Sequence, residues 1–123
     1  MIGPKEARVT PAQSRAAYAK VAERSFGLCE GCGTRQATQM HHRVYRSRGG
    51  RDEVVNLLHL CSDAVGGNVD GCHGEAHNDP ERQIHGWSVP SHEKPRDRPV
   101  LYRGAWVYLM PDGGLEPMGG VTW

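Results

Sequence analysis

The chain has 123 residues, a formal net charge of +1 and 37% hydrophobic residues, with 16 glycines and 8 prolines. This length predicts one domain, and the modest apolar share predicts a small core that a bound metal would help to stabilise. The sequence lacks the apolar run of roughly 18 residues that a membrane span requires, and also the apolar stretch of a secretory signal. We therefore expect a cytoplasmic protein, not secreted and with no membrane partner, whose cysteines bind metal more readily than they form disulfides.

The N-terminal part of the chain predicts a helix. Residues 1–9 are expected to form a disordered lead. Thr10 and Pro11 are a typical helix start, because a threonine hydroxyl caps free backbone amides and proline fits the first turn. The Ala-rich stretch that follows continues the helix, and Gly27 is the residue type that commonly ends one.

The middle of the chain predicts two short strands and a second helix. Residues 37–42 and 56–61 are rich in strand formers, and the loop between them, residues 44–54, contains a Gly-Gly pair. Residues 72–86 have a helical pattern that Pro80 interrupts. Since the two strands are separated by a loop and followed by a helix, a ββα unit is expected.

The C-terminal part predicts a β-hairpin. Residues 99–104 and 105–114 are clusters of β-formers around an Arg-Gly turn, and a second turn is expected at Asp112 and Gly113. Together with the two helices, these strands place the chain in the α+β class.

Four cysteines form a candidate zinc site. Cys29 and Cys32 are a C-x₂-C knuckle, which places two thiolates on one turn at the geometry of tetrahedral zinc. Cys61 and Cys72 would complete the set, although ten residues separate them, which is longer than in most knuckles. A Cys₄ zinc site is the favoured interpretation. A Cys₃His site, two disulfides or free thiols are the alternatives.

Arginines are concentrated in the loop after the first strand. Arg43, Arg46, Arg48 and Arg51 follow one another with no acidic residue among them. Guanidinium groups bind phosphate oxygens in pairs, so this cluster is suited to a polyanion. A solvated loop would have the same composition, and the arginines alone do not separate the two interpretations.

The chain has seven histidines, and four of them fall into two pairs. His41 and His42 end the first predicted strand. His73 and His77 are four residues apart, so they share one face of the second predicted helix. Cys72 lies about a third of a helical turn from His73, and can therefore face the zinc while His73 faces elsewhere.

These parts together resemble an HNH endonuclease of the ββα-metal type. The resemblance covers residues 29 to about 77, in the order C-x₂-C, MHHRVYRSRGG, NLLHLC and CHGEAH. The preceding helix and the GWSVP segment are similar to small HNH proteins of bacteriophages. The resemblance implies an HNH nuclease domain over residues 10–80, and we expect residues 81–123 to be an extension of the same domain.

The resemblance also assigns roles to individual residues. His42 matches the general base that takes a proton from water, and His41 matches a ligand of the catalytic metal that is more often Asp in this family. Asn56 matches the asparagine that holds the loop and orients the base. His73 matches the last metal ligand. His77 matches a second histidine found in colicin-type nuclease domains, which is either a metal ligand or a phosphate contact.

The implied reaction is hydrolysis of DNA to 5′-phosphate and 3′-hydroxyl ends. Arg43, Arg46 and Arg48 are the candidate phosphate-binding residues, and Arg46 or Arg48 could stabilise the charged transition state. Histidine ligands favour Mn²⁺, Ni²⁺, Co²⁺ or Zn²⁺, whereas Mg²⁺ prefers oxygen, so the catalytic ion stays open among Mg²⁺, Mn²⁺, Ni²⁺ and Zn²⁺. The expected cofactors are this ion and one structural zinc, with no small-molecule cofactor.

Two alternatives from other classes stay open. The chain could be a zinc-knuckle module that binds nucleic acid without cutting it, although such a binder has no use for a general base beside a metal ligand. It could also be an inactive accessory of phage DNA packaging, because several phage relatives are thought to work beside terminase. The expected partners are therefore DNA and, for a phage protein, terminase subunits.

Overall fold

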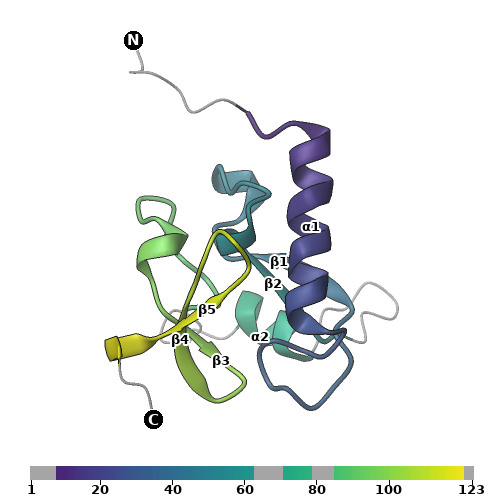
Figure 1. Cartoon of the computed structure of the whole chain (residues 1–123), viewed down its shortest axis with the longest axis vertical. Helices are drawn as coiled ribbons and strands as arrows, with labels where there is room; N and C mark the ends of the chain where they lie inside the picture. Colours follow the sequence, from purple (N-terminus) through teal and green to yellow (C-terminus); the bar gives the residue numbers. More distant parts are fainter. Residues whose placement is uncertain (1–7, 63–70, 79–84, 121–123) are drawn as a thin grey trace.

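The computed structural model describes residues 8–62, 71–78 and 85–120. The fold is α+β, as predicted, and consists of two helices and two small antiparallel sheets (Figure 1). The helices are α1 (Pro11–Ser25) and α2 (Gly71–Asn78). The strands are β1 (Gln39–His42), β2 (Leu57–Leu60), β3 (Val100–Tyr102), β4 (Ala105–Leu109) and β5 (Leu115–Pro117). Neither described helix has the length and apolar run that crossing a membrane requires.

Helix α1 begins where the sequence predicts. The Thr10 hydroxyl accepts a hydrogen bond from the backbone N–H of Gln13, and the Gln13 side chain accepts one from the backbone N–H of Thr10, forming a complete capping box. Ser25 is the last residue of the helix, because Phe26, the residue before the predicted glycine, adopts a left-handed conformation with φ of 57°. Gly27 follows with φ of 75° and completes the turn away from the helix.

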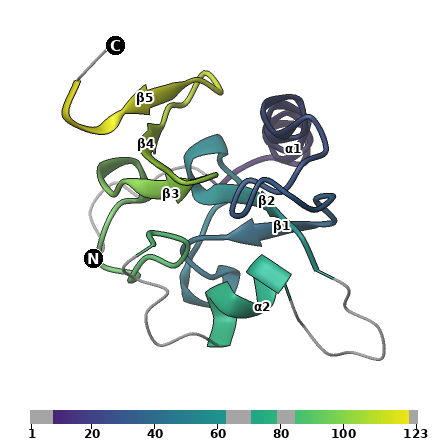
Figure 2. The ribbon, with the colours of Figure 1, turned by 90° about the horizontal axis from the view of Figure 1, so that it is seen from below.

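The hairpin of β1 and β2 lies between the two helices. Figure 2 shows α1 on one side of this hairpin and α2 on the other. Leu57 packs against Ala17 and Val21 of α1, whereas the next residue, Leu58, belongs to the core cluster that also contains Ala76 of α2. Since successive strand residues point to opposite faces, the hairpin contributes one face to each helix.

The C-terminal hairpin is confirmed, with one strand more than predicted. Strands β3 and β4 are joined by Arg103 and Gly104, whose φ angles of 50° and 87° are those of a tight hairpin turn that matches the twist of its strands. The Asp112 side chain accepts a hydrogen bond from the backbone N–H of Gly114 at 2.7 Å and closes the second turn. That turn leads into β5, which pairs with β4.

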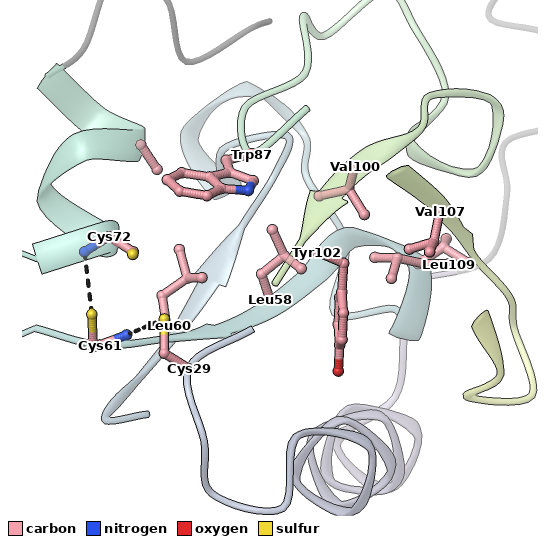
Figure 3. Packing of buried hydrophobic residues seen from close by; sticks show 12 residues of the cluster. Cys29, Leu58, Leu60, Cys61, Cys72, Trp87, Val100, Tyr102, Val107 and Leu109 are labelled. Atoms are coloured by element: carbon pink, nitrogen blue, oxygen red, sulfur yellow. Dashed lines mark hydrogen bonds between the residues drawn. The ribbon is translucent and has the colours of Figure 1, made fainter. Parts of the chain in front are cut away.

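One hydrophobic cluster joins the ββα unit to the C-terminal segment. It contains Leu58 and Leu60 of β2, Trp87, and buried residues of β3 and β4 such as Val100 and Leu109. In Figure 3 the Trp87 indole lies beside Cys72 and Leu60, and the apolar side chains of the C-terminal sheet continue the same layer. Residues of the C-terminal extension therefore complete the core of the preceding unit.

Arg43 is a buried polar link between these two parts. Its guanidinium is fully buried and donates four hydrogen bonds to carbonyl oxygens, at 2.8 to 2.9 Å. The acceptors are Val55 in the unit before α2 and Gly86, Pro95 and Arg98 in the extension. The prediction that Arg43 binds substrate phosphate is therefore wrong, because protein carbonyls occupy its donors and solvent does not reach it.

Parts of two predictions lie outside the described residues. These are most of the predicted disordered lead, which is described only from residue 8, and the predicted break of the helical pattern at Pro80. The proposed boundaries at residues 10–80 and 81–123 stay a prediction, although the shared cluster favours one folding unit.

We predict that Arg43→Met lowers the free energy of unfolding by about 3 kcal/mol or more. The substitution keeps the aliphatic volume but leaves several buried carbonyl groups without a donor, and each such group costs on the order of 1–3 kcal/mol. Urea denaturation of the purified proteins measures this change. Arg15→Met, at an exposed position of α1, is the matched control and should change stability by less than about 0.5 kcal/mol. Equal denaturation midpoints for Arg43→Met and wild type would refute the anchoring role.

Candidate metal centre and active site

The four cysteines lie together, as the sequence predicts. One sulfur atom from each of Cys29, Cys32, Cys61 and Cys72 lies within 4.8 Å of all the others, and none is in a disulfide. Cys61 directly follows β2, and Cys72 is the second residue of α2. The end of β2 and the start of α2 thus bring Cys61 and Cys72 together, although ten residues separate them in the sequence. The cluster is compatible with a zinc site.

Backbone amides of the cluster point at the sulfur atoms. Cys29 accepts a hydrogen bond from the backbone N–H of Gly31 at 3.3 Å. It accepts a second from the N–H of Cys61 at 3.3 Å, and Cys61 accepts one from the N–H of Cys72 at 3.4 Å (Figure 3). The Cys72 thiol also donates to Cys29, and against the effect of burial these bonds lower the pKa of Cys29 to about 4. The same contact with Cys29, together with burial, raises the pKa of Cys72, and burial raises the pKa of Cys61, so only part of the cluster is stabilised as thiolate by the protein itself. Zinc binds thiolates, and its positive charge would stabilise the deprotonated form of the other cysteines.

Three histidines form a second cluster next to the first. One ring nitrogen from each of His41, His73 and His77 lies within 4.8 Å of the other two, and the Nε2 atoms of His73 and His77 are 3.2 Å apart. His41 comes from β1, and the other two come from one face of α2. The backbone N–H of His73 donates to the carbonyl oxygen of Cys61, so the cysteine cluster and the histidine cluster share the start of α2.

The environment of His41 is suited to a metal ligand. Its Nε2 atom lies 2.6 Å from the carbonyl oxygen of Trp87, which can only accept a hydrogen bond, so Nε2 carries the proton. The lone pair is then on Nδ1, which is buried and has no hydrogen-bond partner among the described residues. Burial lowers the pKa of His41 to about 3, so the ring is neutral. A neutral imidazole with one nitrogen held by a carbonyl and the other unpartnered is a typical metal ligand with its supporting contact.

The side chain of His42 points to the opposite face of the β1–β2 hairpin from the side chain of His41. Its Nε2 atom donates to Asp52 Oδ1 at 2.6 Å, and the Ser14 hydroxyl of α1 donates to the other oxygen of the same carboxylate. Partial burial opposes ionisation of Asp52, but the hydrogen bonds from His42 and Ser14 and the positive charge of Arg46 hold its pKa below the ordinary value. An ionised Asp52 therefore keeps the proton of His42 on Nε2 and the lone pair on Nδ1.

Asn56 holds the loop that carries these residues. The buried amide of Asn56 accepts a hydrogen bond from the backbone N–H of Val44 and donates to the carbonyl oxygens of Val44 and Arg51. These contacts join the two ends of the Gly-Gly loop. Position 50 in this loop requires glycine, because a Cβ there would lie 1.7 Å from the carbonyl oxygen of Val44.

The two exposed arginines of the loop lie on different sides of the strand end. Arg46 interacts electrostatically with Asp52 on the His42 side. Arg48 lies over the ring of Tyr45, at 5.8 Å from its centroid, and Tyr45 in turn stacks on His77 with centroids 4.9 Å apart. Cationic groups are thus available beside both histidine sites.

A family model described as HNH endonuclease matches residues 29–79. The chain carries an HNH endonuclease domain. The match begins at the first cysteine of the cluster and ends one residue after α2, so it contains both clusters and the loop between the strands. No curated protein and no solved structure matched the chain. An HNH domain indicates nuclease activity and implies a DNA substrate.

The HNH domain brings together most of the residues that the sequence singles out. His41, His73 and His77 converge, while His42 lies on the other face of the strand and Arg43 is an internal anchor. Sequence reasoning missed Asp52, which has no informative spacing from His42. It also missed Trp87, which holds His41 through a backbone oxygen that any residue type could supply.

We predict that the cysteine cluster holds a zinc ion that stabilises the fold. Cys72→Ser should retain no zinc after mild chelation and should melt at a clearly lower temperature than wild type, because zinc binding contributes to the folding free energy of a small domain. Zinc analysis and thermal melting of the same preparations measure both effects.

His73→Ala is the matched control for this experiment, since it changes the neighbouring residue of the same helix. It should keep the chelator-resistant zinc and a melting temperature close to wild type. A Cys72→Ser protein that keeps both the zinc and the melting temperature would contradict the assignment.

Proposed function

We propose that the protein is a metal-dependent endonuclease that hydrolyses the phosphodiester bonds of DNA to 5′-phosphate and 3′-hydroxyl ends. The observation that carries this proposal is the convergence of three histidine nitrogens within 4.8 Å inside an HNH domain. In this proposal His41, His73 and His77 hold a divalent ion, and the four cysteines hold a structural zinc. A bound divalent ion would polarise the scissile phosphate and neutralise negative charge on the leaving 3′ oxygen.

His42 is the proposed general base. Because it is the residue after His41 at the end of β1, a phosphate lying across the strand end would be within reach of both side chains. The Nδ1 lone pair of His42 would take a proton from the attacking water, while Nε2 stays bound to Asp52. Asp52 and Ser14 are positioning residues in this scheme, since they act only through the orientation and tautomer of His42.

The remaining proposed roles concern the loop. Asn56 keeps the ends of the loop at a fixed separation and so fixes the place of Asp52 relative to His42. Arg46 and Arg48 are exposed and would contact phosphate oxygens of the substrate. Mn²⁺, Ni²⁺ and Zn²⁺ suit a site of three imidazoles better than Mg²⁺, which prefers oxygen.

We also propose a cellular setting for this activity. We propose a cytoplasmic protein that is encoded by a bacteriophage and acts in an infected cell, where it is linked to DNA packaging by terminase. The support for this is the similarity of the motif order and of the GWSVP segment to small phage HNH proteins. A pure nucleic-acid binder is less well supported, because binding alone requires neither the histidine cluster nor the His42–Asp52 pair.

We predict that the wild-type protein cuts supercoiled plasmid only with a divalent ion and that His42→Ala reduces the rate by about 10²–10⁴-fold. The loss should occur without a change in zinc content, melting temperature or DNA affinity, because His42 is not a proposed ligand. Agarose gels scored for nicked and linear plasmid, with Mg²⁺, Mn²⁺, Ni²⁺ and Zn²⁺ tested in turn, measure the rate.

Two variants of Asp52 serve as controls for the role of His42. Asp52→Asn keeps an acceptor oxygen for His42 Nε2 and should keep more activity than Asp52→Leu, which removes the acceptor. Both should bind DNA like wild type. Cleavage by His42→Ala at the wild-type rate, or full wild-type activity in excess chelator, would overturn the proposed mechanism.

A further inference from the structure

We propose that a hollow beside the histidine cluster binds the phosphate next to the scissile one on the same DNA strand. This proposal rests on the nuclease function proposed above and names a second site for the same substrate. Five of the seven residues that line the hollow belong to the C-terminal extension, outside the segment that matches the HNH family. The extension would therefore take part in substrate binding as well as in the core.

The hollow has a volume of about 270 Å³ and two sources of lining residues. The HNH loop supplies Tyr45 and Arg48, and the extension supplies residues 88–92. Two hydrogen bonds fix the position of residues 88–92. The backbone N–H of Val89 donates to the carbonyl oxygen of Arg43, and the Ser88 hydroxyl donates to the carbonyl oxygen of Ala76 in α2. The two walls are thus tied to the same strand and helix that carry the histidine cluster.

Tyr45 connects the hollow to the histidine cluster. Its ring stacks on the ring of His77, with the two centroids 4.9 Å apart. It also lies in a T-shaped arrangement with the ring of His41, with the two centroids 6.2 Å apart. Arg48 lies near the same ring, and both residues line the hollow. One aromatic ring therefore separates the two sites. Since phosphates recur about every 3.4 Å of helix axis along a DNA strand, a strand with one phosphate at the histidines brings the next within reach.

The charge of the hollow favours an anion. Arg48 is a permanent cation at its edge, and Ser91 and His92 add hydroxyl and imidazole groups that can donate to phosphate oxygens. No residue that lines it in the described part of the chain is acidic. The carboxylate of Glu93, the residue after His92, lies 3.7 Å from the His92 ring nitrogen but pairs with Arg98 at 2.8 Å. A phosphate is the part of DNA that this set of groups recognises best.

Binding of small nucleotides tests the second site independently of cleavage. Thymidine 3′,5′-bisphosphate carries two phosphates on one sugar, whereas the 5′- and 3′-monophosphates carry one each, and none contains a diester bond to cut. With Mn²⁺ present, calorimetry should find that wild type binds the bisphosphate about tenfold more tightly than either monophosphate, as expected for one added charge-assisted contact. In Arg48→Ala and His92→Ala this advantage should fall to about twofold or less.

Arg96→Ala is the matched control, because Arg96 is exposed, cationic and part of the extension but does not line this hollow. It should keep the tenfold advantage. Equal affinity of wild type for the bisphosphate and the monophosphates, or an unchanged advantage in both Arg48→Ala and His92→Ala, would overturn the proposal.

Two cleavage substrates separate this proposal from the nuclease function itself. Bis(4-nitrophenyl) phosphate contains a diester but no neighbouring phosphate. His92→Ala should therefore cut it at the wild-type rate while cutting plasmid about tenfold more slowly. Equal slowing of His92→Ala on both substrates would place His92 at the scissile phosphate and contradict a second site. If wild type cuts neither substrate, the nuclease proposal fails, and the nucleotide affinities still decide the second site.

Discussion

The alternation of side chains at the end of strand β1 is the constraint on which the arrangement of the site depends. His41 points toward α2 and joins His73 and His77, whereas His42 points toward α1 and pairs with Asp52. Arg43, the next residue, turns back into the protein and binds carbonyl groups of the extension. Three consecutive residues thus serve a candidate metal site, a candidate base and the anchor of the C-terminal segment, because the backbone directs each one differently.

The cysteine cluster determines where the other half of the site lies. Cys61 ends the β2 side of the hairpin and Cys72 begins α2, and backbone hydrogen bonds from Cys72 and His73 reach the sulfur and the carbonyl oxygen of Cys61. A zinc ion bound there would fix the start of α2 against the hairpin. Because His73 and His77 lie on that short helix, the proposed stabilising ion and the proposed catalytic ion are coupled through the same turn.

The C-terminal extension has a larger role than its sequence suggests. Trp87 fills the core with its indole and holds His41 with its backbone oxygen. Residues 85–98 also accept most of the hydrogen bonds of Arg43. The ββα unit therefore depends on this segment for the orientation of a proposed ligand.

Much of the fold and of the candidate site could be predicted from the sequence. The capping pair at Thr10, the hairpin turn at Arg103 and the cysteine and histidine sets all depend on local chemistry or on the order of short motifs. The burial of Arg43 could not be predicted, because an arginine beside other arginines has the same local sequence whether it faces phosphate or protein carbonyls. The pairing of Asp52 with His42 and the carbonyl of Trp87 at His41 depend on tertiary placement, which spacing along the chain does not encode.

In the proposed metal site, the backbone carbonyl of Trp87 binds Nε2 of His41 and so leaves Nδ1 as the metal-binding atom, with His73 and His77 as the other two ligands. Anomalous diffraction from crystals of the protein grown with Mn²⁺ would locate the ion and its ligand atoms. We expect a manganese peak bound by Nδ1 of His41 and by one ring nitrogen each of His73 and His77, with Nε2 of His41 still donating to the carbonyl oxygen of Trp87. A manganese peak that does not involve His41, or one bound by His42 and Asp52 in its place, would contradict it.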